Sequence, residues 1–223
     1  MVERREQLGK LVVLLALVAL LGYRWATGAL VFYIHPRYTW LVAGALALLL
    51  AMALAADRRH SPHHSDRPSL PYWLLALPAL LALLPPTPLG AGAKKALDLG
   101  SATVTLRGGQ VALEPLERNL LDWTLLITER GPQAVAGQPA KVVGFVYPSG
   151  GADEFTLARF LVTCCTADAR GVGLLVRYAG ASALEANQWV EVEGEMATHG
   201  DQAVLIAQRL QLIDQPPNPY LYP

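Results

Sequence analysis

Apolar residues are concentrated in the N-terminal part of the chain, where they form three long runs. The runs cover residues 11–34, 38–56 and 70–89 and contain few charged side chains. Because about 20 apolar residues cross the hydrocarbon core of a bilayer, they predict three transmembrane helices. Residues 1–93 are therefore expected to form an α-helical membrane anchor.

Two of these runs allow a second interpretation. The first has the charged start and the small residues near 26–29 of a signal peptide, but apolar residues resume directly after them. The third begins with Tyr72 and Trp73, and Pro78 would kink a helix there. It either crosses the membrane or lies on its surface.

The distribution of basic residues predicts the orientation of the anchor. They lie before the first run and between the second and third runs, at Arg4, Arg5, Lys10, Arg58, Arg59 and Arg67. Such segments remain in the cytoplasm. With three spans in a plasma or inner membrane, the N-terminus is cytoplasmic and the rest of the chain is extracytoplasmic; with two spans, the rest is cytoplasmic.

Two features of the anchor are candidate contacts for another membrane protein. Arg24 lies within the first run, where a charge costs about 2.5–3.5 kcal/mol on insertion scales. It either reaches toward the membrane surface or contacts another subunit. The short turn between the first two runs, with His35, Pro36 and Arg37, is the second candidate.

The pattern changes after residue 93. Residues 94–140 read as a tether followed by an amphipathic helix, because apolar residues recur at helical spacings between 116 and 126. Five short segments with strand character follow, over 141–148, 154–165, 171–179, 188–197 and 202–214, with a short helix expected just before the fourth. Residues 141–223 are therefore predicted to form an all-β, OB-like five-stranded barrel.

Composition and charge narrow the function. The 223 residues are 53% hydrophobic and only 16% charged, as expected for a chain with a membrane part. The part from Lys94 onward is mildly acidic, which argues against a nucleic-acid partner. Since no nucleotide-binding glycine loop, nucleophile elbow or zinc-protease motif occurs, the protein is not expected to be an enzyme.

The two cysteines of the chain are neighbours, Cys164 and Cys165, with Asp168 close behind. They could pack in the core, bind a soft metal ion or carry out redox chemistry. Adjacent side chains of a strand point to opposite faces, and a disulfide between neighbours is strained. A metal site needs about four ligands, and His199 is the one histidine after residue 93 that could add to these three.

Several segments together resemble the YcgQ-like permease-subunit family. They are YIHPRY at 33–38, VVGFVYP at 142–148, EFTLARFLVTCCTADA at 154–169, WVEVEGE at 189–195 and QPPNPYLYP at 215–223. The resemblance implies an accessory partner of a larger multi-span membrane permease, with a link to the homeostasis of zinc or other metals. It also implies a site at Cys164, Cys165 and Asp168, with Arg159 in support.

The sequence thus predicts an accessory permease subunit whose cysteine pair handles zinc or another soft metal ion. A thiol-redox module and a purely structural subunit are the alternatives. The expected partners are the bilayer and the larger permease subunit.

Overall fold

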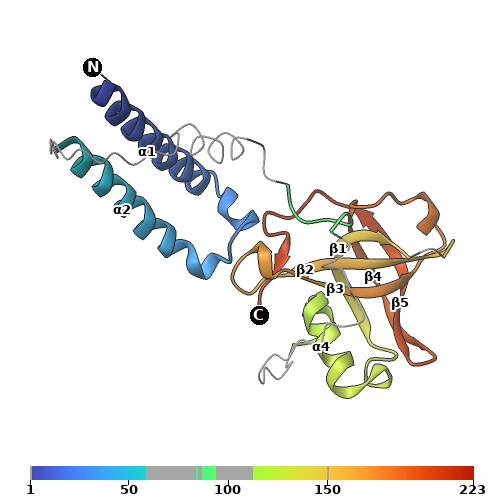
Figure 1. Cartoon of the computed structure of the whole chain (residues 1–223). Coiled ribbons are helices and arrows are strands. Elements are labelled where there is room, and N and C mark those ends of the chain that lie inside the picture. The colour runs from blue at the N-terminus through green and yellow to red at the C-terminus, as the bar shows by residue number, and fades with distance from the viewer. Residues whose placement is uncertain (1, 59–83, 85–86, 94–112, 150) are drawn as a thin grey trace. The chain divides into compact units, whose positions relative to one another are not determined.

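The computed structural model describes residues 2–58, 84, 87–93, 113–149 and 151–223 (Figure 1). These residues form two compact units, Met1–Thr87 and Pro88–Pro223.

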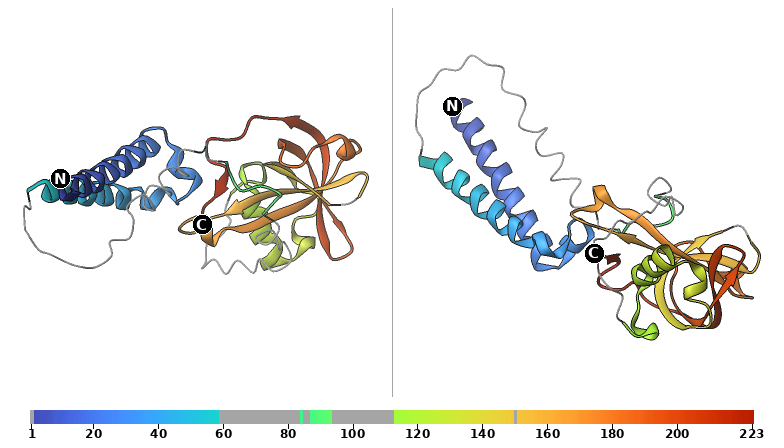
Figure 2. Two further views of the ribbon diagram at one scale, coloured as in Figure 1. Left: turned by 45° about the horizontal axis from the view of Figure 1, so that its top comes forward. Right: turned by 90° about the horizontal axis from the view of Figure 1, so that it is seen from below.

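The N-terminal unit is a helical hairpin. Helix α1 (Val2–Ala26) and helix α2 (Thr39–Arg58) lie side by side and are joined by two 3₁₀ turns, Ala29–Phe32 and Pro36–Tyr38 (Figures 1 and 2). Helix α1 is followed by Gly28, whose φ of 72° is in the left-handed region that glycine tolerates best. This glycine reverses the chain toward α2.

The hairpin agrees with part of the predicted anchor. Among the described residues, one helical stretch, Pro36–Ala55, is long and apolar enough to cross a membrane, which is weak evidence for a span. The first predicted span, over 11–34, is wrong as one continuous helix. Its apolar helical part is Leu11–Ala26, because the chain turns at Gly28. The third predicted span falls almost wholly outside the described residues.

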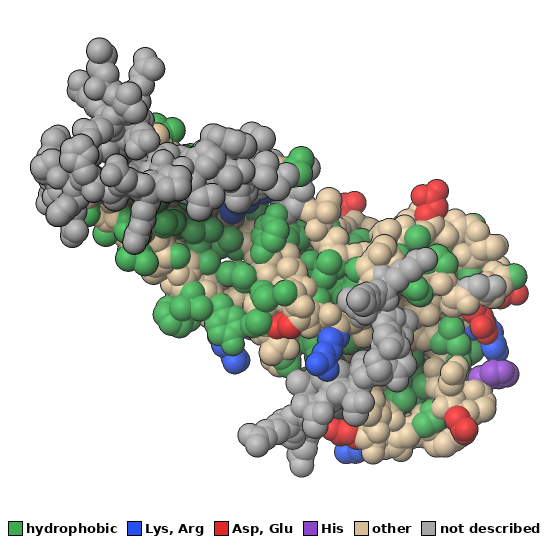
Figure 3. All heavy atoms as spheres, in the orientation of Figure 1, with side chains coloured by type: hydrophobic (Ala, Val, Ile, Leu, Met, Phe, Trp, Pro, Cys, Tyr) green, Lys and Arg blue, Asp and Glu red, His purple; other side chains and the backbone are tan. Residues whose placement is uncertain are grey.

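The outer surface of the hairpin is apolar. Large hydrophobic side chains are exposed on both helices, among them Val12, Leu15, Leu41, Leu48, Leu50, Met52 and Leu54. Figure 3 shows apolar side chains gathered on the visible part of the hairpin. Among the described residues of the hairpin, the charged side chain of Arg24 is buried. It donates a hydrogen bond from Nη2 to the carbonyl oxygen of Leu84 at 2.6 Å. The unit therefore presents hydrocarbon outward and holds an arginine inward.

The C-terminal unit is a closed five-stranded β-barrel, as predicted. Its strands are β1 (Pro139–Pro148), β2 (Glu154–Leu161), β3 (Arg170–Arg177), β4 (Trp189–His199) and β5 (Gln202–Leu212). Strand β1 pairs with β2 and β4, β3 pairs with β2 and in parallel with β5, and β4 pairs with β5. This order closes the sheet and is OB-like.

The barrel interior and helix α4 (Leu120–Arg130) share one core. The helix starts at a capping box in which Asn119 and Asp122 accept hydrogen bonds from each other's backbone N–H groups. Its residues Leu120 and Trp123 are fully buried and belong to the same apolar cluster as Val142, Leu157 and Val192 of the strands. The predicted amphipathic helix is thus part of the barrel unit (Figure 1).

A second apolar cluster lies on the other face of the same strands. Leu157 and Leu161 of β2 belong to the main core, whereas Phe160 belongs to the second cluster, as expected for side chains that alternate along a strand. This cluster includes Phe145, Ala158, Val162, Trp189 and Tyr220. Two of its members, Val162 and Tyr220, come from segments outside the five barrel strands.

Three local features differ from the sequence prediction. Strand β2 ends at Leu161 instead of continuing through the cysteines. A 3₁₀ turn over Ala181–Ala183 replaces the short helix expected before β4. A sixth strand, β6 (Tyr220–Leu221), pairs in parallel with the end of β2 and has no hydrophobic alternation long enough to predict it.

The Gly194→Ala variant is expected to lose about 1–3 kcal/mol of unfolding free energy, as overpacked cores do. Gly194 lies at a β-bulge in β4, and an added Cβ would collide with the backbone carbonyl of Ile206 in β5. Denaturant unfolding followed by tryptophan fluorescence would measure the loss. The control is Gly92→Ala, where nothing lies within 4 Å of the added Cβ. Equal stabilities of the two variants would contradict this account of the bulge.

Candidate metal centre

The loop between β2 and β3 carries both cysteines. The backbone bends at Thr163 and Cys164, returns to an extended conformation at Cys165 (φ −156°, ψ 169°) and then forms the 3₁₀ turn Thr166–Asp168. Cys164 is exposed, and Cys165 is half-buried. The two residues therefore belong to a bend and not to a regular strand.

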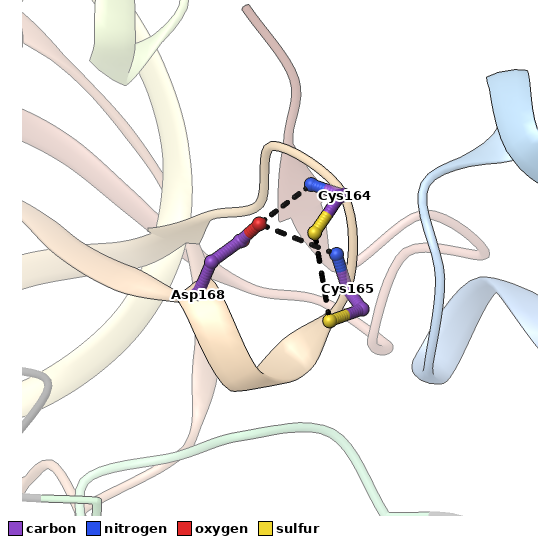
Figure 4. Close-up of side chains that lie close together, drawn as sticks. All are labelled: Cys164, Cys165 and Asp168. Carbon is purple, nitrogen blue, oxygen red and sulfur yellow. Dashed lines mark hydrogen bonds between the residues drawn. The ribbon is translucent and has the colours of Figure 1, made fainter.

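The Asp168 carboxylate fixes this bend. It accepts hydrogen bonds from the backbone N–H groups of Cys164 at 2.7 Å and Cys165 at 3.4 Å (Figure 4). A third comes from the backbone N–H of Thr163 at 3.0 Å. An ionised carboxylate is an acceptor at both oxygens, so it can satisfy several donors at once. The three-residue spacing between Cys165 and Asp168 allows the side chain to reach back over the turn.

The bend brings the two sulfurs to the same side of the chain. The Sγ atoms of Cys164 and Cys165 are 3.6 Å apart, and both are free thiols. One potential ligand atom from each of Cys164, Cys165 and Asp168 lies within 4.8 Å of the other two. The strand geometry that would have placed the thiols on opposite faces does not apply, because β2 has ended at Leu161.

The pKa values of the site reflect the concentration of acidic groups. Hydrogen bonds with the Asp168 carboxylate and with Cys165 raise the pKa of the Cys164 thiol to about 12. Partial burial of Asp168 raises its pKa, but the hydrogen bonds from the Cys164 thiol and the three backbone N–H groups outweigh it and lower the pKa overall. Asp168 is therefore ionised at neutral pH and accepts a hydrogen bond from the Cys164 thiol, which keeps its proton.

This donor set suits a thiophilic cation. Zinc is bound tetrahedrally with Zn–S bonds of about 2.3 Å, which corresponds to about 3.8 Å between two sulfurs on one ion. The observed sulfur separation of 3.6 Å is close to this value without rearrangement. A divalent cation would also replace the thiol protons beside the Asp168 carboxylate.

Arg159 lies on β2, before the loop. Its guanidinium donates hydrogen bonds to the carbonyl oxygens of Asn218, Pro219 and Tyr220 at 2.6–3.3 Å and lies over the ring of Trp189. Burial lowers the pKa of Arg159. The structure thus connects this predicted support residue to a segment at the end of the chain.

His199 is not brought to the cysteines. It is exposed at the end of β4, in the hairpin turn to β5, and it is not among the residues whose ligand atoms cluster with the thiols. The candidate site therefore consists of three side chains within the part of the chain that the structure describes.

The residues of the hairpin that were predicted to contact a partner differ in their burial. Arg24 is buried against Leu84, whereas Pro36 and Arg37 are exposed in the connecting turn. His35 caps that turn by accepting a hydrogen bond at Nδ1 from the Arg37 backbone N–H at 2.9 Å, and its ring contacts Tyr38 edge to face. The turn presents one exposed basic side chain.

Sequence reasoning missed two parts of this arrangement. The first is the set of backbone N–H groups at 163–165, which no side-chain pattern identifies. The second is the segment 218–222, whose residues Tyr220 and Leu221 are buried. The prolines within and around it, at 216, 217, 219 and 223, were a usable signal for a non-helical segment.

Cys164 is expected to react slowly with iodoacetamide at pH 8, because the thiolate is the nucleophile and the raised pKa keeps the thiol protonated. In Asp168→Asn the acceptor charge is removed, and alkylation of Cys164 should become about tenfold faster. Mass spectrometry of the labelled peptide would give the rate, with Cys165 in the same peptide as the internal reference. An unchanged or slower rate for Cys164 in the variant would contradict this explanation.

One protein-family model matches the C-terminal part of the chain. Residues 113–223 match the family model of the DUF1980 C-terminal domain. The comparison with curated proteins gives no match. Two crystal structures of asparaginyl-tRNA synthetase from Pyrococcus horikoshii, one complexed with asparaginyl-adenylate, are 17% and 18% identical with a TM-score of 0.26. Each match covers 41% of this chain and 24% of the synthetase chain, and a likeness this low carries no argument about function.

Proposed function

We propose that the protein is an accessory membrane subunit of a two-component permease and that Cys164, Cys165 and Asp168 bind a thiophilic metal ion such as zinc. Residues 113–223 of this chain match the DUF1980 C-terminal domain, which contains all three residues. The observation that carries the proposal is the convergence of three potential ligand atoms within 4.8 Å on one surface loop. The YcgQ-like resemblance supplies the permease partner and the link to metal homeostasis.

The position of the site supports transient binding of a cargo ion. Structural zinc sites have four protein ligands and are closed, whereas sites that exchange a ligand keep a position open. The three side chains here are exposed or half-buried. A fourth ligand from a partner protein or a small molecule could therefore reach the ion, and this is the arrangement that transfer of the ion requires.

The hairpin supports the membrane part of the proposal. Besides its apolar surface, four aromatic side chains are exposed near the connecting turn: Tyr23, Trp25, Tyr33 and Trp40. Tyrosine and tryptophan are enriched at membrane–water interfaces. We infer that this end of the hairpin lies at a membrane–water interface. If the third span that the sequence predicts over 70–89 crosses the membrane, the barrel lies outside the cytoplasm.

A zinc titration of the full chain in detergent tests the metal proposal. The parent should bind one zinc ion per chain in competition with a chromophoric chelator, and cadmium should give a thiolate absorption band on binding. Absence of both would overturn the proposal.

Alkaline phosphatase and green fluorescent protein fusions at Gly100 test the membrane topology separately. A fluorescent and phosphatase-negative result would contradict the placement of the barrel outside the cytoplasm.

The second candidate function is thiol redox chemistry, favoured by the 3.6 Å sulfur separation. It is the weaker candidate because a disulfide between two neighbouring residues is strained. A reversible Cys164–Cys165 disulfide in a chain that binds no metal would favour it over zinc binding.

A further inference from the structure

The segment 218–222 completes the barrel at the point where the cysteine loop begins. Strand β1 pairs with β2 only as far as Ala158, so that edge of β2 would be unpaired from Arg159 onward. Strand β6 pairs with this part of β2, with Phe160 opposite Tyr220 and Leu161 opposite Leu221. The N–H of Val162 then donates to the carbonyl of Leu221 at 3.0 Å.

Arg159 holds the same segment by its backbone. One guanidinium donates to three successive carbonyl groups, those of residues 218–220, which fixes the path of the segment whatever its side chains are. Arginine suits this task because its donors form a rigid planar fork. A lysine at this position could not reach all three carbonyl groups in the same geometry.

Packing joins the segment to both ends of the cysteine loop. Val162 precedes the loop and belongs to the second apolar cluster together with Tyr220. Ala169 follows the loop and packs against this cluster, as Tyr222 does. Val162 and Tyr220 are almost fully buried. The hydroxyl oxygen of Tyr220 also accepts a hydrogen bond from the N–H of Leu89 at 3.1 Å, which fixes its ring from the other side.

We propose that residues 218–222, held by Arg159, are the positioning element of the Cys164–Cys165–Asp168 site. The proposal rests on the metal-binding function proposed above. The segment fixes the residues on either side of the loop, and the loop then keeps the two sulfurs on one side. Arg159 acts through this segment, because its guanidinium donates to the carbonyl oxygens of residues 218–220.

The test compares Arg159→Gln and Arg159→Lys with the parent, as full chains in detergent. Outer residues that orient metal ligands typically contribute 10–100-fold in affinity, so Arg159→Gln should bind zinc about 10–100-fold more weakly. Arg159→Lys should lie between the two. The control is Arg177→Gln, which removes an arginine that pairs with Glu154 at the other end of β2 and should bind as the parent does.

A second readout does not depend on metal. Amide hydrogen exchange of the peptide covering 160–169 should accelerate in Arg159→Gln, while that of α4 stays as in the parent. If Arg159→Gln does not fold, the same comparison is made with Arg159→Lys. Parent-like zinc affinity and parent-like exchange in the folded arginine variants would overturn the positioning role. If the parent itself binds no zinc, the metal function fails, and the exchange measurement still decides whether Arg159 positions the loop.

Discussion

Replacing both cysteines, in Cys164→Ser, Cys165→Ser, should abolish zinc binding. Thiolates supply two of the three potential ligands, and a serine hydroxyl keeps its proton at neutral pH and binds zinc poorly. The affinity should fall by roughly a thousandfold or more, since metal binding depends on deprotonated ligands. Competition with a chromophoric chelator would measure it on the full chain.

The single variants provide the matched controls. Cys164→Ser and Cys165→Ser each retain one thiolate and should bind with intermediate affinity. The exposure of Cys164 and the half-burial of Cys165 mean that the double variant should lose less than about 1 kcal/mol of unfolding free energy. A large loss of stability with parent-like zinc affinity would show that the cysteines are packing residues.

Asp168→Ala should have the second-largest effect, because it changes the shape of the loop and also removes a ligand. Three backbone N–H groups lose their acceptor, so the bend that aligns the sulfurs is no longer fixed. Zinc affinity should fall by about 100-fold, at the upper end for residues that orient ligands. Unfolding free energy should fall by about 1–2 kcal/mol through the lost charge-assisted hydrogen bonds.

The dependence of this stability on pH distinguishes the carboxylate from a shape effect. The folded-state pKa of Asp168 is lowered from its ordinary value of 3.8, so its contribution is complete above that value and is lost as the pH falls through the folded-state pKa. The difference in stability between the parent and Asp168→Asn should therefore be constant near neutral pH and shrink in acid. A difference that persists unchanged below pH 3.8 would exclude the charge as its origin.

Much of the fold could be predicted from the pattern of apolar residues. The five strands followed from runs with strand character between turn signals, and Val190 and Val192 face the core while Glu191 and Glu193 stay partly exposed, as alternation requires. Helix α2 followed from its unbroken apolar run. The end of α1 was missed because Gly28 takes a left-handed conformation that the run of apolar residues conceals.

The residues of the candidate site could be selected from the sequence, but their geometry could not be predicted. Cys164, Cys165 and Asp168 were selected by residue type and spacing, whereas the relation of the two sulfurs depends on where β2 ends. At that end, β2 pairs with β6, and Arg159 donates to the carbonyl oxygen of Pro219. The two partners of each contact are about 60 positions apart in the sequence. Local periodicity carries no information about such contacts.

The most direct test of the central claim is X-ray absorption at the zinc edge of the loaded full chain. We expect two sulfur neighbours per zinc at about 2.3 Å, with oxygen or nitrogen completing the coordination shell of the ion. We also expect the sulfur signal to disappear in the Cys164→Ser, Cys165→Ser variant. Zinc surrounded only by oxygen and nitrogen in the parent would contradict the assignment of the cysteine pair as a metal site.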